Sequence, residues 1–258
     1  MDFAGKVVVI TGASTGIGRA AAINFSHRGA NLVLVSRNKD ALEKVKPNLS
    51  DTADVLLIPC DVSDNNQVID MAKKTLKHFG RIDILVNNAG FAILSTITNQ
   101  KISDIESQMK TNYFGMIYCI KQFLPVMLER NSGHIVNVAS VAGSFGLAQI
   151  APYCASKYAM LGFSEGLKQE LYNTNVDVTV VSPMMTKTNF FDHPSFVNMH
   201  KYSPMTLTPE QVARVIIRAS GSSRLEIIVP SYVRIVIWLK QTFPFIINPI
   251  IHHIMMRK

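Results

Sequence analysis

The sequence is poor in cysteine, with three residues among 258, and they stand far apart at Cys60, Cys119 and Cys154. No Cys-x-x-Cys pair occurs, so we expect neither a disulfide framework nor a zinc site, and no other metal site is predicted. The adjacent His252 and His253 are interpreted as a polar break in the tail. Because unpaired thiols suit a reducing compartment, we expect a cytoplasmic protein.

Long apolar runs and clusters of like charge are also scarce. The first residues lack the charged segment and the apolar stretch of a secretory signal, so none is expected. No basic cluster with interleaved aromatic residues occurs, so nucleic acid is not expected as a partner. Charged residues make up 17% and apolar residues 48% of the chain, which argues against disorder and predicts a domain with a full core.

Short apolar segments alternate with segments of helical length along most of the chain. Seven of them have the composition of buried strands: residues 6–11, 31–36, 55–59, 82–87, 134–139, 177–182 and 225–229. Helical apolar spacing is clearest in residues 17–27, 67–79, 102–128 and 152–172. This alternation predicts a parallel sheet covered on both faces, the doubly wound (Rossmann-type) α/β fold. We expect one catalytic domain over residues 1–229, with ligands at the carboxyl ends of the strands.

A glycine-rich segment, TGASTGIG, runs from Thr11 to Gly18, after the first expected strand and into the first expected helix. Glycines at Gly12, Gly16 and Gly18 allow a tight turn there. They also let backbone N–H groups approach a pyrophosphate at the positive end of the helix. The sequence therefore predicts a dinucleotide site in this turn.

The end of the second expected strand bears on which dinucleotide binds. An NAD site usually has a carboxylate there, whereas this chain has Ser36, Arg37 and Asn38. A guanidinium pairs with the 2′-phosphate of NADP, which a carboxylate would repel. We therefore predict NADP(H), with Arg19 as a second contact; the alternative is that Arg37 is a solvated loop residue.

Asp61 follows the third expected strand and has two interpretations. Its carboxylate is suited to accept a hydrogen bond from the adenine amino group. It is equally suited to cap the following helix, a role for which Ser63 and Asp64 compete. The sequence leaves both interpretations open.

Tyr153 and Lys157 are four residues apart, and Tyr153 follows Ser140 by thirteen residues. On a helix, residues at this spacing share a face. An ammonium beside a phenol favours the phenolate, so Lys157 is expected to lower the pKa of Tyr153. A tyrosine of this kind exchanges a proton with an alcohol or a carbonyl near neutral pH. Together with the dinucleotide site, this predicts a carbonyl/alcohol oxidoreductase.

These motifs occur in an order that resembles the short-chain dehydrogenase/reductase family over roughly residues 5–229. The motifs are the glycine segment, Asn88-Ala89-Gly90, Asn112, Ser140 and Tyr153-x-x-x-Lys157. The resemblance implies that Tyr153 is the general acid in reduction and the base in oxidation. It also implies that Lys157 binds the nicotinamide ribose, that Ser140 polarises the substrate carbonyl, and that Asn112 anchors a water linking Lys157 to solvent.

The resemblance also implies contacts to the cofactor and the substrate. The expected cofactor contacts are Gly12, Ser14, Thr15, Gly16, Ile17, Gly18, Ser36, Arg37, Asn38, Asp61, Val62, Asn88, Ala89, Gly90, Tyr153, Lys157, Pro183, Thr186 and Thr188. The expected substrate contacts are Ser140 and Tyr153. The chain departs from the family where Pro183 is followed by Met184 in place of glycine, so we expect another backbone route there and Met184 beside the substrate. A homodimer or homotetramer through residues 102–128 and 152–172 is implied by analogy.

Residues 184–208 interrupt the regular alternation and are rich in methionine and phenylalanine, among them Met199. Such adaptable side chains suit a lid over an apolar substrate; the alternative is a surface loop packed on its own apolar residues. Because this segment holds few charges, we expect an uncharged, hydrophobic substrate such as a lipid, a steroid or a retinoid-like carbonyl.

Residues 230–258 form an apolar tail that holds four cations and no acid. Arg234, Lys240, Pro244 and Pro249 interrupt it, so it lacks the ~20 apolar residues that span a bilayer. With Trp238 and flanking cations, the tail is typical of an anchor on a membrane surface. The alternatives are packing on its own domain, roofing of the substrate pocket, or burial in an oligomer interface.

The sequence thus predicts an NADP(H)-dependent oxidoreductase for a hydrophobic carbonyl or alcohol. Two alternatives stay open. One is an enzyme similar to 3-oxoacyl-carrier-protein reductase, in which the net charge of +8 would meet an acidic carrier. The other is a non-catalytic protein that senses NADP(H) and docks to a membrane or a partner through its tail.

Overall fold

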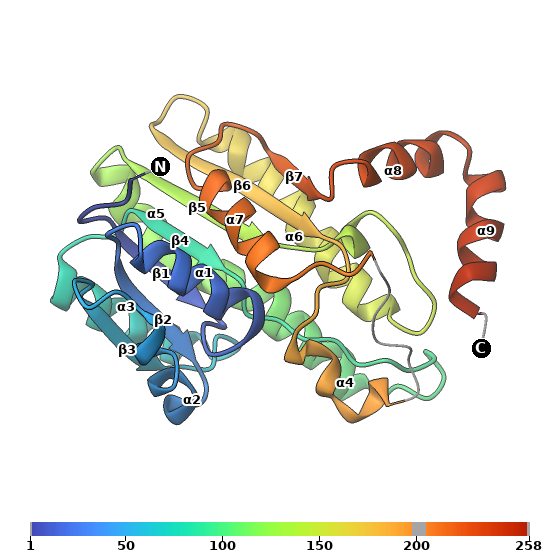
Figure 1. The fold of residues 1–258 in the computed structure, drawn as a ribbon. Coiled ribbons are helices and arrows are strands. Elements are labelled where there is room, and N and C mark those ends of the chain that lie inside the picture. Colours follow the sequence, from blue (N-terminus) through green and yellow to red (C-terminus); the bar gives the residue numbers. More distant parts are fainter. Residues whose placement is uncertain (1, 198–204, 257–258) are drawn as a thin grey trace.

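The computed structural model describes residues 2–197 and 205–256, in which seven strands form one parallel sheet (Figure 1). The strands are β1 (Val7–Thr11), β2 (Asn31–Ser36), β3 (Val55–Pro59), β4 (Ile84–Asn87), β5 (Gly133–Val138), β6 (Val176–Pro183) and β7 (Glu226–Val229). Their order is β3-β2-β1-β4-β5-β6-β7, so the winding reverses between β1 and β4. The predicted doubly wound fold is confirmed.

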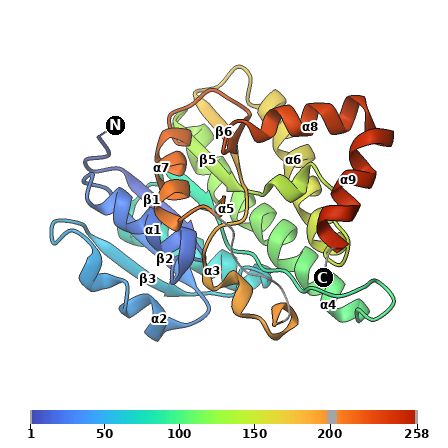
Figure 2. The ribbon, with the colours of Figure 1, turned by 45° about the vertical axis from the view of Figure 1, so that its right-hand side comes forward.

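Helices cover both faces of the sheet (Figures 1 and 2). On one face lie α1 (Gly16–Ser26), α2 (Lys39–Glu43) and α7 (Pro209–Ala219); on the other lie α3 (Asn65–Phe79), α5 (Gly115–Glu129) and α6 (Ala151–Glu170). Alternation along β1 divides the core, because Val8 and Ile10 pack with the first group of helices and Val7 and Val9 with the second. Buried strands of this kind need no polar face.

The long helix predicted over residues 102–128 is divided in the structure. It consists of α4 (Ile102–Met109), a π-helical segment (Lys110–Phe114) and α5. The apolar spacing does not reveal the division, because one extra residue in a turn only shifts the phase of the pattern. The extra residue turns the Asn112 side chain into the protein, where it is 1% exposed.

The expected lid contains short ordered elements. After β6, two 3₁₀ turns (Asn189–Asp192 and Pro194–Phe196) follow, and Thr186 forms a bridge with Leu207. Residues 198–204 of the lid, including Met199, lie outside the described residues.

The tail contains two helices, α8 (Val233–Thr242) and α9 (Pro244–Met256), beyond the end of β7 (Figure 1). Within the described ranges, no helix combines the length and the apolar character that crossing a membrane requires. The division into residues 1–229 and 230–258 stays a prediction, because α8 packs on the preceding part of the chain through Val233 and Ile237.

Candidate active site

A tight turn joins β1 to α1, as the glycine pattern predicts. Gly12 and Gly16 have positive φ angles of 65° and 53°. A Cβ added at Gly12 would lie 2.9 Å from Asn88 Nδ2, so no other residue fits there. Thr15 makes no side-chain capping bond to α1, and the first turn of that helix holds no acid. Its first N–H groups therefore keep a positive, uncapped end for an anion.

The segment after β4 is tied to this turn. Thr11 Oγ1 accepts hydrogen bonds from the N–H groups of Asn88 and Ala89, at 3.0 and 3.1 Å. Asn88 Nδ2 donates to the carbonyl oxygens of Thr11 (3.0 Å) and Gly12 (3.2 Å). The predicted motif Asn88-Ala89-Gly90 thus fixes the position of the glycine turn at the switch point of the sheet.

The end of β2 presents a free cation. Ser36 Oγ donates to the carbonyl of Asn38 (3.1 Å), and Asn38 Oδ1 accepts from Ala41 N (3.0 Å) to cap α2. Arg37 between them is exposed, and no hydrogen bond or ion pair within residues 2–197 and 205–256 engages its guanidinium. Arg19 on α1 is exposed as well.

The structure decides which acid caps α3. Asp64 is the capping residue and accepts from the N–H groups of Asn66 and Gln67. Asp61 accepts from Ser63 with one oxygen, Oδ1, at 2.9 Å from N and 2.7 Å from Oγ. Helix capping is therefore not the role of Asp61, and the adenine contact stays a prediction for it and for the neighbouring Val62.

Tyr153 and Lys157 lie on one face of α6, and both are buried, at 9% and 3% exposure. Lys157 Nζ is 5.7 Å from the centre of the Tyr153 ring. It donates to the carbonyl of Val138 (3.0 Å) and contacts Met160 Sδ (3.4 Å). Among the described residues no carboxylate forms an ion pair with it, so this ammonium is buried without a compensating charge.

The pKa values differ from the expectation for this pair. Burial raises the pKa of Tyr153 to about 12, and hydrogen bonding by Ser140 only partly offsets this. Burial also lowers the pKa of Lys157 to about 7. In the protein alone the pKa of Tyr153 is therefore raised, where a lowered pKa was expected, because desolvation is its largest cause. The effect of Lys157 on this pKa stays a prediction.

Ser140 and Asn112 approach the pair from two other elements. Ser140 follows β5; its Oγ accepts from Ala142 N (3.1 Å) and lies 3.4 Å from the Pro183 carbonyl. Asn112 Nδ2 donates to Ser156 Oγ on α6 (3.0 Å).

The other hydrogen bonds of Asn112 hold the segment after β4. Its Nδ2 donates to the carbonyl of Phe91 (3.0 Å), and its Oδ1 accepts from the N–H of Phe91 (3.0 Å). A Cβ added at Gly90 would lie 3.0 Å from Asn112 Oδ1 and 3.6 Å from Lys157 Nζ. The four predicted catalytic side chains are thus brought to one site.

The segment after β6 closes over the glycine turn. A Cβ added at Gly16 would lie 2.9 Å from Thr188 Cγ2. Thr186 Oγ1 donates to the carbonyl of Met184 (2.9 Å), and Met184 N donates to Val229 O (2.8 Å). Asn131 and Gln149 are the non-glycine residues with positive φ in the described ranges, so Met184 fits in place of glycine without strain. The backbone after Pro183 continues the pairing with β7.

Aromatic residues of the expected lid pack directly on Tyr153. The ring of Phe190 lies 5.5 Å from the Tyr153 ring, edge to face, and 5.2 Å from that of Phe191. The remaining members of this cluster are also apolar: Ala92, Leu94, Ala142, Leu147, Ile150, Cys154, Met185 and Phe196. The surroundings of the phenol are therefore predominantly hydrophobic.

Several residues of the site escaped the sequence analysis. Ser156, which anchors Asn112, lies between Tyr153 and Lys157 and was detectable as a polar residue on their helix. Met160 and the Phe91 backbone carry no sequence signal for their contacts. Within the described part of the chain, no group of three or more histidine, cysteine or acidic residues is arranged to hold a metal ion.

Comparison with known proteins gives consistent matches. A profile described as short chain dehydrogenase matches residues 6–195. Dehydrogenase/reductase SDR family member 7B of Xenopus laevis is 36% identical over 240 residues, covering 88% of this chain and 74% of that protein. A short-chain dehydrogenase/reductase from Burkholderia phymatum, solved in complex with NAD, superposes with a TM-score of 0.85 at 28% identity, covering 94% and 95% of the two chains. A metagenomic short-chain oxidoreductase in complex with NADP gives 0.75 at 28% identity, covering 87% and 96%.

Proposed function

Because the chain belongs to the short-chain dehydrogenase/reductase family, we propose that it uses NADP(H) to interconvert a hydrophobic ketone or aldehyde with its alcohol. Family membership makes it an oxidoreductase with a nicotinamide cofactor, and the choice of NADP(H) and of the substrate class is the proposal. One observation carries it. The Tyr153 phenol lies beside Ser140 and Lys157 inside an apolar cluster.

The turn between β1 and α1 fits a dinucleotide. Its glycines leave no room for side chains, and the uncapped start of α1 suits a pyrophosphate. The exposed guanidinium of Arg37 supports NADP(H), because it is available to pair with the 2′-phosphate. Asp61 and Val62 would meet the adenine, and Thr186 and Thr188 the nicotinamide end. When bound, the nicotinamide supplies or accepts the hydride.

The protein's own residues supply the proton. In reduction, Tyr153 gives its proton to the substrate oxygen as the hydride reaches the carbonyl carbon; oxidation reverses both transfers. The raised pKa of Tyr153, about 12, keeps the phenol protonated at neutral pH, as an acid requires. Ser140, which lies near enough to that phenol to oppose the rise of its pKa, donates to the same oxygen and polarises it. Asn112 positions α6 through Ser156.

The substrate class follows from what surrounds Tyr153. Phe190, Phe191 and Leu147 belong to the apolar cluster that contains Tyr153. A carbonyl on an extended apolar skeleton would bury its surface against these rings. The proposal therefore favours lipid-like or steroid-like substrates.

The test is the loss of NADPH absorbance with a panel of ketones and aldehydes that differ in apolar size. We expect kcat/KM to rise with apolar surface. In Tyr153→Phe, turnover should fall about 10²- to 10⁴-fold, the range for a positioned general acid. Tyr172→Phe is the matched control, because Tyr172 is 86% exposed.

Equal turnover in Tyr153→Phe and the unaltered enzyme would contradict the assigned acid. Preference for a carrier-bound 3-oxoacyl substrate over free apolar carbonyls would favour the reductase alternative. The non-catalytic alternative predicts NADPH binding without turnover of any carbonyl.

Three further proposals concern the whole protein. We propose a cytoplasmic location, consistent with three buried free cysteines, and a homodimer or homotetramer. Exposed Phe114 and Leu128 on the long helices support such pairing, which light scattering will test. We also propose that residues 230–258 contact a membrane surface. That surface lies outside the catalytic cluster, so the proposals can fail separately.

A further inference from the structure

Helix α8 has two different faces. Val233 and Ile237 point into the protein and are 5% and 7% exposed. Ile235 and Trp238, which are 62% and 58% exposed, lie on the opposite face. Exposing large apolar side chains to water is unfavourable in free energy, so a face of this composition is typical of a contact surface.

The exposed apolar face continues into the start of α9. Phe243, Phe245, Ile246 and Ile250 are between 40% and 74% exposed. Helix α9 packs mainly on α8, which leaves these side chains uncovered by the sheet domain. Together with Tyr232, Ile235, Val236 and Trp238 they define the tail surface.

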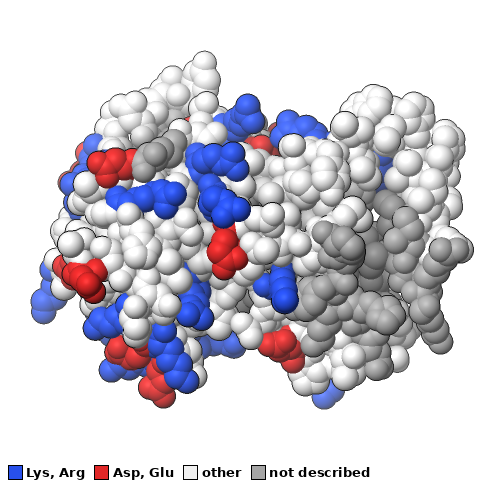
Figure 3. Space-filling view, in the orientation of Figure 1, with Lys and Arg blue, Asp and Glu red and all other residues white. Residues whose placement is uncertain are grey.

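Charge indicates the partner of the tail surface. The last acid in the chain is Glu226, and the residues after it include Arg234, Lys240, Arg257 and Lys258. On the visible face of Figure 3, charged side chains are spread over the sheet domain, and few appear among the coloured side chains where α8 lies. A surface rich in Trp, Phe and Ile, with the exposed cation Arg234 on the same helix and no acid after Glu226, matches an anionic lipid interface. Apolar side chains enter the acyl boundary there, while a cation remains at the headgroups.

The inner side of α8 is attached to a loop of the active site. Lys240 Nζ donates to the carbonyl of Ser144 (3.0 Å) and lies 3.3 Å from the hydroxyl of Tyr158 on α6. It is also 5.7 Å from the centre of the Phe145 ring. The helix therefore cannot move far without moving residues 141–147.

A chain of apolar contacts joins the tail to the catalytic tyrosine. Leu147 packs against the cluster that contains Phe145, Val233 and Ile237. It also packs against the cluster that contains Tyr153. One side chain thus borders both the base of α8 and the site of proton transfer.

We propose that the tail surface docks on an anionic lipid bilayer and holds the loop of residues 141–147 at the lipid–water boundary. Docking depends only on α8 and α9. Its consequence, that an apolar substrate reaches Tyr153 from the lipid, rests on the proposed function. An interfacial position agrees with two short helices separated at Pro244.

Trp238 provides the measurement, because it is the single tryptophan of the chain and lies on the tail surface. The full-length protein is mixed with vesicles of phosphatidylcholine, alone or with phosphatidylglycerol. We expect the tryptophan emission to shift to shorter wavelength with the anionic vesicles, and brominated lipid to quench it. Binding to neutral vesicles should be at least about fivefold weaker, since the exposed cation Arg234 adds attraction to anionic headgroups.

Matched variants test the assigned face. Ile235→Glu puts a charge on the tail surface and should weaken binding to anionic vesicles at least tenfold, by the loss of apolar burial and added repulsion. Ile102→Glu makes the same change at a 69% exposed isoleucine on α4 and should bind like the unaltered protein. Tyr153→Phe should bind vesicles normally, which separates docking from catalysis.

Two results would overturn the proposal. One is an unchanged Trp238 emission with both kinds of vesicle. The other is equal vesicle binding by Ile235→Glu and the unaltered protein. Light scattering without lipid identifies the rival occupant: if Ile235→Glu dissociates an oligomer that does not bind vesicles, the tail surface belongs to a second copy of the chain.

Discussion

At the amino edge of the sheet the Asp83 carboxylate is buried among three cations, whereas at the carboxyl edge the Lys157 ammonium is buried with no counterion among the residues that the structure describes. Asp83, just before β4, is 5% exposed. Lys6 and Arg130 each lie 3.8 Å from it, and Arg81 forms a hydrogen-bonded pair with it. Its Oδ2 also accepts from Val7 N (2.9 Å).

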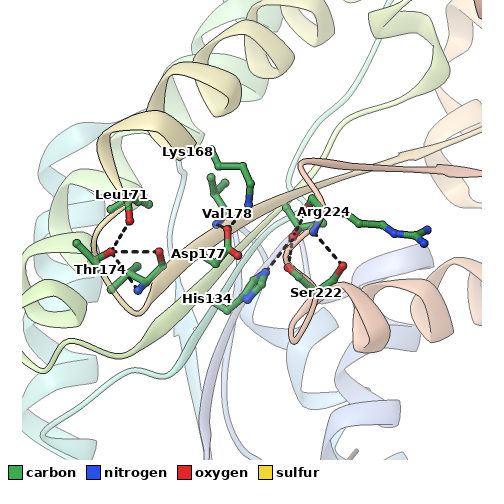
Figure 4. A network of polar contacts seen from close by, with 10 residues as sticks. His134, Lys168, Leu171, Thr174, Asp177, Val178, Ser222 and Arg224 are labelled. Carbon is green, nitrogen blue, oxygen red and sulfur yellow. Dashed lines mark hydrogen bonds and ion pairs between the residues drawn. The ribbon is translucent and has the colours of Figure 1, made fainter.

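Other polar side chains at the amino edge also have partners, as the network in Figure 4 shows. His134 Nε2 lies 3.1 Å from Thr179 Oγ1, whose hydroxyl is within 3.0 Å of the carbonyls of Ser222 and Arg224. Since that hydroxyl donates to a carbonyl, it accepts from the Nε2–H of His134. Burial lowers the pKa of His134 to about 4, so the ring is neutral at pH 7. Asp177 pairs with Lys168. These buried polar groups at the amino edge are satisfied, which stabilises the fold, whereas the buried ammonium of Lys157 at the carboxyl edge has no ion-pair partner in the described chain and is available for chemistry.

The largest effect is expected from Lys157→Met, which separates stability from activity. Turnover should fall by at least about 10²-fold, because the positively charged group at the site is lost. The free energy of unfolding of the cofactor-free variant should be about 2 kcal/mol higher at pH 6, because an apolar chain of similar length replaces a buried unpaired ammonium. Thermal denaturation and the NADPH assay measure both.

The sign of the pH dependence follows from the lowered pKa of Lys157, about 7 against an ordinary 10.5. Between these values the unfolded chain holds a proton that the folded protein lacks, so stability rises with pH across this window. The advantage of Lys157→Met should therefore be full below pH 7 and fade toward pH 10.5. Lys121→Met, at an exposed position on α5, should show no such trend. A stability loss in Lys157→Met at pH 6 would refute the contrast between the edges.

At the amino edge the opposite result is expected from Asp83→Asn. The amide keeps the shape and still accepts from Val7, but three cations lose their carboxylate. Because those cations are partly exposed, we expect a loss of about 2–3 kcal/mol, below the range for a fully buried pair. Activity per folded molecule should not change. Asp70→Asn is the control: its pair with Lys73 is exposed, so its loss should stay under about 0.5 kcal/mol in urea denaturation.

A smaller effect at the same edge is the loss of stability at acid pH that His134 causes. Burial lowers the pKa of His134 to about 4 from an ordinary 6.5. Its contribution to stability is complete above pH 6.5 and is lost as the pH falls toward 4, because only the unfolded chain takes up the proton there. When the pH falls from 6.5 to 4, the free energy of unfolding of His134→Gln should therefore decrease by about 2 kcal/mol less than that of the unaltered protein. His27→Gln, at an exposed site, should behave like the unaltered protein; equal acid sensitivity in both variants would contradict this assignment.

Much of the fold was predictable because it depends on local patterns. Strand composition gave all seven strands, and the glycine spacing gave the turn before α1. The spacing of Tyr153 and Lys157 placed both on one helix face. Each of these follows from neighbours in the sequence.

The remaining features depend on distant contacts. The π-helical turn buries Asn112, whose side chain forms hydrogen bonds with Phe91 and Ser156, two residues that are distant in the sequence. The pKa of Tyr153 is raised mainly by burial, to which Phe190 contributes from another element. The spacing of Tyr153 and Lys157 in the sequence does not reveal this burial, so it predicted a lowered pKa. Lys240 reaches Ser144 across 96 positions in the chain, which no local pattern encodes.

The smallest predicted effect concerns the other cation at the carboxyl edge, Arg37, which is exposed and unpaired in the described chain. Arg37→Asp should weaken NADPH use about tenfold relative to NADH, because a carboxylate repels the 2′-phosphate and accepts from a free ribose hydroxyl. The effect should shrink at high salt, since the site is open to screening. Arg218→Asp, an exposed arginine in the last turn of α7, is the matched control and should leave the ratio of the two kcat/KM values unchanged. If Arg37→Asp also leaves this ratio unchanged, Arg37 does not select the cofactor. The contrast between the two edges then holds for Lys157 alone.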